Sequence, residues 1–158
     1  MIEYFNKLKL IFMGILSMQI IYFFAAVFLI QSQGPLMVPS DNILISVAIA
    51  FGGMALLASR SVRSRFLSTA KAKPDAEGKK TGYLITLIIH MALLEAANLL
   101  NITAYLLTGD KFLLGMILLL LIFAGSQKPG PVKFRIDMGL DQKEFDQMFT
   151  SIPDEDVQ

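Results

Sequence analysis

The chain has 158 residues, of which 54% are hydrophobic and 17% are charged, whereas ordinary soluble domains carry roughly 25% charged residues. This composition indicates a membrane protein that crosses the bilayer several times. The chain has no cysteine and a single histidine, which excludes disulfides, thiolate metal sites, cysteine nucleophiles and bis-histidine haem ligation within one chain. We expect no metal and no cofactor.

Four apolar segments predict four transmembrane helices, at about residues 8–30, 42–59, 83–107 and 111–126. The first is too long for a cleaved signal peptide and is interpreted as a retained anchor. A turn with two prolines is expected at 31–41. The second helix carries small residues that permit close packing of another helix, notably Ala48, Gly52 and Gly53. The fourth is rich in leucine, so much of its surface is expected to face lipid.

Basic residues are concentrated in one connection. Residues 59–80 predict a loop that carries seven of the fourteen lysines and arginines. Because retained basic residues set topology, this loop and both termini are predicted to be cytoplasmic, and only Lys111 lies in an outer connection. We expect the loop to contact anionic headgroups or a soluble partner. Nucleic acid is not expected, since Phe66 is its only interleaved aromatic residue. The predicted headgroup contacts are Arg60, Arg63, Arg65, Lys71 and Lys73.

Residues 128–158 predict a cytoplasmic tail without a second domain. Its apolar and charged residues alternate over 132–138, which predicts an extended segment lying against the membrane or the end of the bundle. Asp141 and Glu144 have the spacing of a capping box, which predicts a short amphipathic helix over about 141–149. The acidic end from Pro153 is expected to be disordered.

The predicted fold is therefore an all-α membrane protein. A four-transmembrane-helix bundle over residues 1–127 is followed by a short cytoplasmic C-terminal amphipathic helix. The composition and charge pattern predict a multi-pass membrane protein with cytoplasmic N- and C-termini.

The third apolar segment carries the strongest candidate site. Glu95 falls near the bilayer midplane, where an ionisable residue is a functional-site hypothesis by default. On a wheel of about 100° per residue, Asn101, Asn98 and Glu95 lie about 20°, 80° and 140° from His90. The polar residues therefore share one sector, which we expect to face inward. Gln19, near the centre of the first helix, is their expected partner, with a protonated Glu95 donating to a carbonyl such as that of Gln19.

Two main hypotheses remain for this polar seam, defined as Gln19, His90, Glu95, Asn98 and Asn101. The seam can be structural, joining helices by hydrogen bonds. Alternatively, Glu95 takes up and releases a proton or cation, with Asn98 as a neighbouring ligand. A lipid, quinone or peptide site is a further possibility. His90 is expected to be a hydrogen-bonded bundle residue rather than a metal ligand.

Two resemblances bear on this segment. The order of a small-residue helix with FGG at 51–53, an arginine-bearing loop and a helix with ALLEAA at 92–97 resembles the hairpin of the proteolipid (c-type) subunits of rotary ATPases. That resemblance implies that Glu95 carries an ion. The stretch from Glu95 through LTGD at 107–110 resembles small four-helix bacterial membrane proteins, for which the family implies no activity. We favour the second resemblance, which implies a location in the bacterial inner (cytoplasmic) membrane.

The residues do not indicate an enzyme, because neither a catalytic triad, a glycine-rich phosphate loop nor a catalytic carboxylate pair is evident in the sequence. The expected function is that of a non-enzymatic structural or accessory subunit with a buried polar seam. The alternative is a proton- or cation-binding, proteolipid-like protein that uses Glu95. The expected partners are the lipid bilayer and either further copies of the chain or a larger membrane complex.

Overall fold

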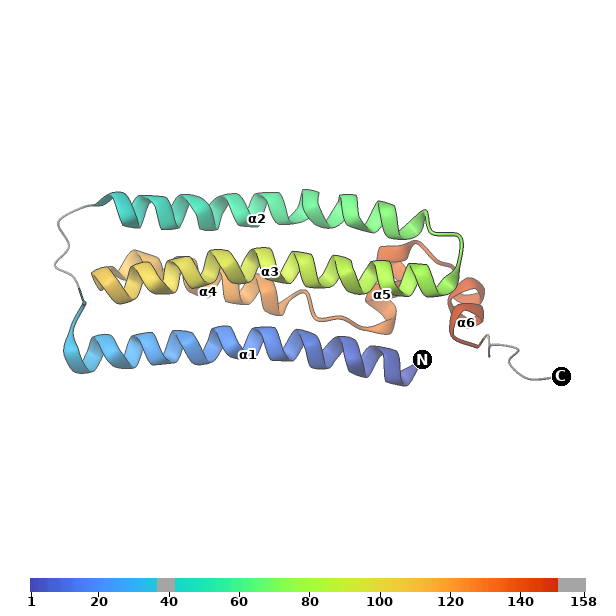
Figure 1. Cartoon of the computed structure of the whole chain (residues 1–158), viewed down its shortest axis with the longest axis horizontal. Coiled ribbons are helices and arrows are strands. Elements are labelled where there is room, and N and C mark those ends of the chain that lie inside the picture. Colours follow the sequence, from blue (N-terminus) through green and yellow to red (C-terminus); the bar gives the residue numbers. More distant parts are fainter. Residues whose placement is uncertain (37–41, 151–158) are drawn as a thin grey trace.

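The computed structural model describes residues 1–36 and 42–150, and every regular element in these ranges is a helix. The helices are α1 (Ile2–Gln33), α2 (Asn42–Lys71), α3 (Ala76–Thr108), α4 (Lys111–Gly125), α5 (Pro131–Met138) and α6 (Gln142–Thr150). Figure 1 shows α1, α2 and α3 side by side, the shorter α4 beside α3, and α5 and α6 at the end that holds the N-terminus. Since α1, α2 and α3 are each long and apolar enough to cross a bilayer, the fold is that of an α-helical membrane protein.

The central helix is α3, which packs against α1, α2 and α4. It begins after Asp75, whose carboxylate accepts a hydrogen bond from the Gly78 N–H at 2.6 Å. It ends at Gly109, which has a φ of 69° and donates its N–H to the Tyr105 carbonyl at 2.7 Å. The apolar part of α3 is 44% buried, against 17% in α1 and 22% in α2. The other helices are therefore arranged around α3.

Three predicted helix boundaries are wrong at the end that holds the N-terminus. α1 begins at Ile2 instead of about residue 8, α2 continues to Lys71 instead of residue 59, and α3 begins at Ala76 instead of residue 83. The loop expected at 59–80 is therefore only residues 72–75. At about 1.5 Å per residue, α2 and α3 are roughly 45 and 50 Å long. They extend past a hydrocarbon core of about 30 Å, and basic residues are good helix formers in the polar layers beyond it.

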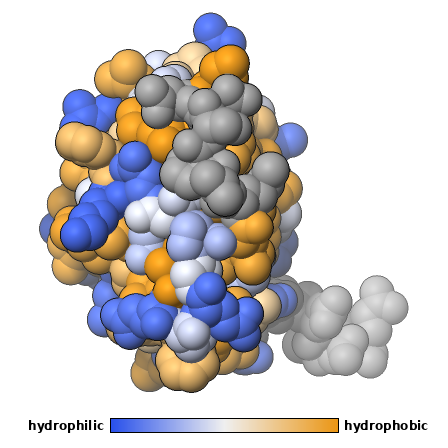
Figure 2. Space-filling view, turned by 90° about the vertical axis from the view of Figure 1, so that its left-hand side faces the viewer, coloured by the Kyte–Doolittle hydropathy of each residue, from blue (hydrophilic) through white to orange (hydrophobic). Residues whose placement is uncertain are grey.

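At the opposite end, α1 continues to Gln33, so the turn expected at 31–41 begins later than predicted. The rest of that turn lies partly outside the described residues, and the disorder expected from Pro153 lies wholly outside them. Figure 2 looks onto this end, where hydrophilic residues gather on the end face. The exposed polar residues here include Gln31, Gln33 and Lys111.

The extended segment expected at 132–138 is a helix. Phe134 and Met138, four residues apart, are buried on one side of α5, whereas Val132 and Ile136 are 65% and 69% exposed on the other. Residues four apart share a helix face. The segment looks alternating because apolar residues of the exposed face and of the buried face together occupy every second position of this short helix.

The capping box at the start of α6 is confirmed. The Asp141 carboxylate accepts from the Glu144 N–H at 2.7 Å, and the Glu144 carboxylate accepts from the Asp141 N–H at 2.9 Å. The helix spans Gln142–Thr150, close to the predicted 141–149. Two otherwise unpaired backbone donors are thus satisfied.

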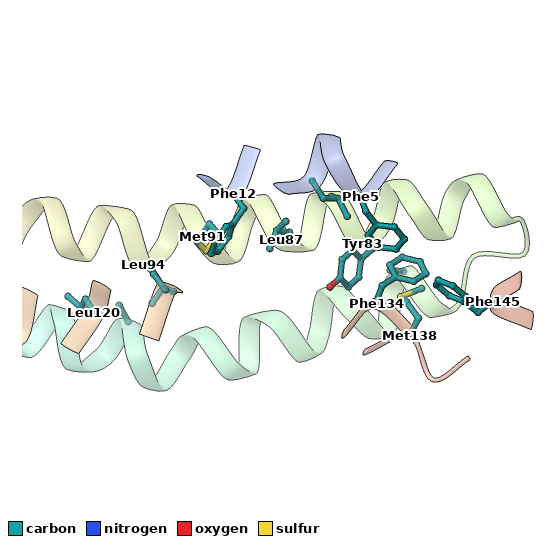
Figure 3. Close-up of a cluster of buried hydrophobic side chains, with 14 of the residues drawn as sticks. Phe5, Phe12, Tyr83, Leu87, Met91, Leu94, Leu120, Phe134, Met138 and Phe145 are labelled. Atoms are coloured by element: carbon teal, nitrogen blue, oxygen red, sulfur yellow. The ribbon is translucent and has the colours of Figure 1, made fainter. Parts of the chain in front are cut away.

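An aromatic cluster fixes α5 and α6 to the bundle (Figure 3). Phe134 of α5 is fully buried, with its ring centroid 4.7 Å from that of Tyr83 in α3 and 5.8 Å from that of Phe5 in α1. Phe145 of α6 lies 6.1 Å from Phe134. Because these side chains belong to the same buried cluster as Met91 near the middle of α3, the tail helices continue the core of the bundle.

Candidate functional site

Three residues of the predicted polar seam join the long helices. Gln19, Asn98 and Asn101 are fully buried. The Asn98 Nδ2 donates to the Gln19 Oε1 at 3.0 Å, which links α3 to α1. The Asn101 Nδ2 donates to the Ala48 carbonyl of α2 at 3.0 Å and to the Ala97 carbonyl of its own helix at 2.8 Å. These bonds tie both α1 and α2 to the polar sector of α3.

His90 makes a further contact between α2 and α3. It is 2% exposed, and its Nδ1 lies 3.2 Å from the Ser59 carbonyl of α2. A small cavity of about 10 Å³ lies beside it, lined also by Tyr83, Thr86 and Gln127. Among the described residues, no group of three or more His, Cys, Asp or Glu side chains could hold a metal ion.

Each of these four seam residues also has a polar atom without a hydrogen-bond partner within residues 1–36 and 42–150. These buried atoms are Gln19 Nε2, His90 Nε2, Asn98 Oδ1 and Asn101 Oδ1. An unsatisfied buried group costs roughly 1–3 kcal/mol. The seam therefore contributes directional contacts that set helix register, and it does so without satisfying all of its own polar groups.

The small residues of α2 differ in whether a neighbouring helix packs closely against them. A Cβ atom at Gly52 would lie 2.9 Å from the Met116 Cγ and 3.0 Å from the Asn101 Nδ2. Ala48 is fully buried and supplies the carbonyl that Asn101 binds. A Cβ atom at Gly53, by contrast, would meet no heavy atom within 4 Å. Close approach of α2 to α3 and α4 thus requires Gly52, whereas no neighbour of Gly53 demands its small size.

The structure separates Glu95 from the rest of the seam. Glu95 is half-buried and lines an open cavity of about 400 Å³ between α1 and α3. The other lining residues are Met18 and Tyr22 of α1 and Leu99 and Thr103 of α3. Met18 is 65% and Tyr22 45% exposed, so this cavity opens to the outside of the bundle.

The expected hydrogen bond from Glu95 to the Gln19 carbonyl is not made, because Asn98 binds that oxygen instead. Glu95 lies about 120° around α3 from Asn101, and this angle turns it away from α2 and toward the outer edge of the contact with α1. Within the described part of the chain, its carboxylate has no hydrogen bond and no ion pair. The prediction that Glu95 faces the inside of the bundle is therefore wrong.

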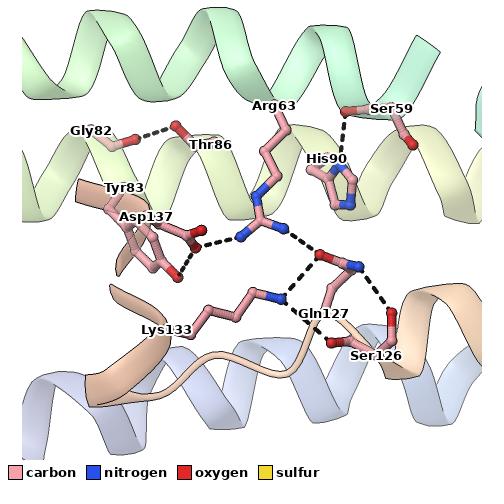
Figure 4. Close-up of polar contacts among 10 residues, drawn as sticks. All are labelled: Ser59, Arg63, Gly82, Tyr83, Thr86, His90, Ser126, Gln127, Lys133 and Asp137. Carbon is pink, nitrogen blue, oxygen red and sulfur yellow. Dashed lines mark hydrogen bonds and ion pairs between the residues drawn. The ribbon is translucent and has the colours of Figure 1, made fainter. Parts of the chain in front are cut away.

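A polar cluster that the sequence reasoning missed joins α2, α3 and α5 (Figure 4). The Arg63 guanidinium forms an ion pair with the Asp137 carboxylate, which also accepts from the Tyr83 hydroxyl at 3.1 Å. Arg63 also donates to the Gln127 side chain, which accepts from the Lys133 Nζ at 3.1 Å. Burial and then the charge of Arg63 lower the pKa of Lys133, while Asp137 opposes this shift. This cluster holds the chain after α4 against the bundle.

One sequence signal could have located α5 and its charges. Gly130 and Pro131 stand at the start of the helix and Gly139, with a φ of 67°, stands just past its end. Proline at the first helical position and glycine after the last are typical of a helix. With a helix over 131–138, Asp137 would have been considered as a partner for a basic residue.

The predicted headgroup residues fall into two groups. Arg63 is half-buried, lies in α2 and is turned into the polar cluster, so it is not the residue of an exposed loop that the sequence predicted. The remaining four are exposed at the same end of the bundle, on α2 or just after it: Arg60, Arg65, Lys71 and Lys73.

Comparisons with a collection of protein-family models, with curated proteins and with solved structures found no match to this chain. The function proposed below therefore rests on the geometry and chemistry of the chain itself.

Proposed function

We propose that this chain is a four-span protein of the bacterial inner membrane, with both termini cytoplasmic, that acts as a non-enzymatic accessory subunit of a larger membrane complex. In this proposal the polar seam maintains the fold, and Glu95 with its cavity is the place where a partner helix docks. The observation that carries the proposal is the half-buried Glu95 carboxylate, which has no partner among the described residues and lies within the long apolar helix α3.

The charge distribution supports the four-span topology. Thirteen of the fourteen lysines and arginines belong to the segments at the end that holds the N-terminus, and Lys111 belongs to the other end. α4 has 15 residues, or roughly 22 Å. A helix this short can span where the bilayer thins locally or where flanking charged residues snorkel. Asp110 and Lys111 stand before its apolar part and Lys128 follows it.

Docking of a partner through Glu95 is favoured because lipid provides no polar partner for its carboxylate. Acyl chains offer neither a hydrogen-bond donor nor a charge, so a carboxylate that faces them is costly. Ion pairing with a basic side chain in a low-dielectric environment would stabilise it strongly. The α1 and α3 residues around Glu95 are otherwise mainly apolar, as expected of a surface that packs against another transmembrane helix.

A second copy of this chain does not supply the missing charge. The sequence has no lysine or arginine in 10–30, 43–59, 83–107 or 112–127, and the single histidine is buried within the bundle. The proposed partner is therefore a different membrane protein with a lysine or arginine in an apolar helix.

A second candidate function is the binding of a proton or cation by Glu95. The observation in its favour is that Tyr22 and Thr103, whose hydroxyl groups could act as additional ligands, line the same cavity. This candidate retains the ion-binding hypothesis but replaces the neighbouring ligand, since Asn98 is engaged with Gln19.

Glu95→Gln separates these possibilities, with Glu77→Gln as a matched control on the exposed first turn of α3. The full chain is purified from native membranes in mild detergent and its partners are identified by mass spectrometry. A photo-crosslinking residue at Leu99 tests contact. We expect the wild type and Glu77→Gln to retain a partner with an intramembrane basic residue, and Glu95→Gln to lose it with little change in thermal stability.

The other outcomes are equally informative. If Glu95→Gln keeps the same partner but loses cation binding and carbodiimide labelling, the second candidate is supported and docking through Glu95 is wrong. A wild type that has no partner, resists carbodiimide and binds no cation contradicts both functions and leaves a structural bundle.

A further inference from the structure

A basic cavity of about 410 Å³ lies at the other side of the molecule, between α2 and α5. It is lined by Leu67 and by the polar residues Arg60, Arg63, Ser64, Ser68, Lys71 and Asp137. On α2, the positions 60, 64, 68 and 71 recur at three- and four-residue intervals, so they share one face. The cavity is therefore a groove along the part of α2 that extends beyond the predicted hydrocarbon core.

The groove carries an excess of positive charge. Asp137 is its only lining carboxylate, and it is already paired with Arg63. Arg60 and Lys71 have no ion pair among the described residues. Lys133 adds a further positive charge near Arg63, close enough to Arg63 that this neighbour lowers its pKa. The lining of the groove thus has two positive charges, those of Arg60 and Lys71, that no described carboxylate neutralises, and Lys133 lies near it.

The donors in the groove suit a phosphate group. A guanidinium group can bind phosphate oxygens in a bidentate manner, and a lysine ammonium binds them as a point charge. The Ser64 hydroxyl has no hydrogen bond to another described residue. The Lys71 Nζ lies 3.7 Å from the position that a Cβ atom would take at Gly139, so it reaches across to the end of α5 and closes one end of the groove.

The surroundings of the groove favour a lipid over a free anion. Arg60 is the first charged residue after the apolar stretch 43–59, which places it at the predicted membrane boundary. On the same face of α2, Leu57 is 79% exposed. α5, which contributes Asp137 to the lining, exposes Val132 and Ile136 by 65% and 69%. A soluble anion gains nothing from neighbouring apolar side chains. The acyl chains of a lipid, by contrast, pack against such side chains.

We propose that this groove is a specific site for the phosphate headgroup of an anionic phospholipid, one lipid per chain, with its acyl chains passing along Leu57. Binding there would also neutralise the charge that α2 presents beside α5. The site does not include Glu95 and lies on other helices, so a result against one proposal leaves the other unchanged.

The test uses the full chain in mild detergent and native mass spectrometry with added phosphatidylglycerol or phosphatidylcholine. The variant is Arg60→Gln with Lys71→Gln. The matched control is Arg65→Gln with Lys73→Gln, which removes the same charge from α2 and the following turn but leaves the lining intact. A basic residue near an anionic surface is worth roughly a fivefold change in affinity, so we expect roughly 30-fold weaker binding of phosphatidylglycerol in the variant.

We expect the wild type and the control to retain one phosphatidylglycerol and not to retain phosphatidylcholine. An excess of inorganic phosphate should not displace the lipid. Equal losses in variant and control would show a non-specific basic surface and overturn the proposal. Displacement by inorganic phosphate would show a free-anion site and overturn the lipid source. Equal thermal stability of the two variants without lipid excludes unfolding as the cause.

Discussion

Around Asn98, the helices meet through side-chain amides and small residues, whereas around Phe134 they meet through aromatic rings. In the first region one interhelical bond joins Asn98 to Gln19, and a glycine lets α2 approach Asn101. In the second region, rings from α1, α3, α5 and α6 lie within 4.7 to 6.4 Å of one another in several pairs. The first region lies between apolar helices suited to lipid, whereas the second lies at the end of the bundle where the helices carry charged residues.

The difference follows from how much free energy the burial of an apolar side chain gains in lipid and in water. Lipid tails are as apolar as leucine, so burying another leucine between transmembrane helices gains little, and register depends on close packing and hydrogen bonds. In the aqueous layer, burying an aromatic side chain removes a large apolar area from water. The end that holds the N-terminus can therefore be stable through its aromatic cluster, while the apolar part of the bundle is specified by a few directional contacts.

The largest expected effect comes from breaking the aromatic cluster. Phe134→Ala removes a fully buried ring and should destabilise the docking of α5 and α6 by about 3–5 kcal/mol. Limited proteolysis of the protein in detergent should then cleave between α4 and α6, at sites protected in the wild type. Ile136→Ala, on the exposed face of α5, should leave that protection unchanged. Equal sensitivity of the two variants would contradict the assignment of the two faces.

An intermediate effect is expected at Gly52. Gly52→Ala places a methyl group 2.9 Å from the Met116 Cγ and 3.0 Å from the Asn101 Nδ2, which should cost about 1–3 kcal/mol. Thermal unfolding in detergent micelles measures the effect. Gly53→Ala, which meets nothing within 4 Å, should be neutral or should stabilise α2 by up to about 1 kcal/mol through helix propensity. If both substitutions behave alike, close packing at Gly52 is not what sets the distance between α2 and α3.

The smallest expected effect is the coupling between Gln19 and Asn98. A double-mutant cycle with Gln19→Met and Asn98→Leu should give a coupling of about 0.6 kcal/mol, the average for polar contacts between transmembrane helices. Each single change leaves the other amide without its partner, so the double variant should lose less than the sum of the two. Steric trapping in micelles can resolve this difference. A coupling of zero would mean that the 3.0 Å bond does not hold α1 to α3.

Sequence reasoning succeeded where a signal is local. The apolar stretches identify helices, Asp141 and Glu144 identify a helix start, and the polar positions of α3 pointed to Gln19 as a partner. It failed where a helix continues into water, because lysines and arginines between Ser59 and Lys71 look like a loop only if a helix is expected to end with the hydrocarbon. α5 was missed for a different reason: its alternating apolar and charged residues were interpreted as an extended segment, although glycines and a proline mark the ends of a helix.

The sequence by itself determined that the chain is helical, that several of its segments are apolar enough for a membrane, and that every basic residue but Lys111 lies near the N-terminus, within 59–80 or in the tail. Only the tertiary structure decided that Asn98 and not Glu95 binds Gln19, and that Glu95 lines an outward cavity with Tyr22 and Thr103. The reason is geometric. A helical wheel gives the angle between two side chains on one helix, but which angle faces a neighbour depends on where the other helices pack.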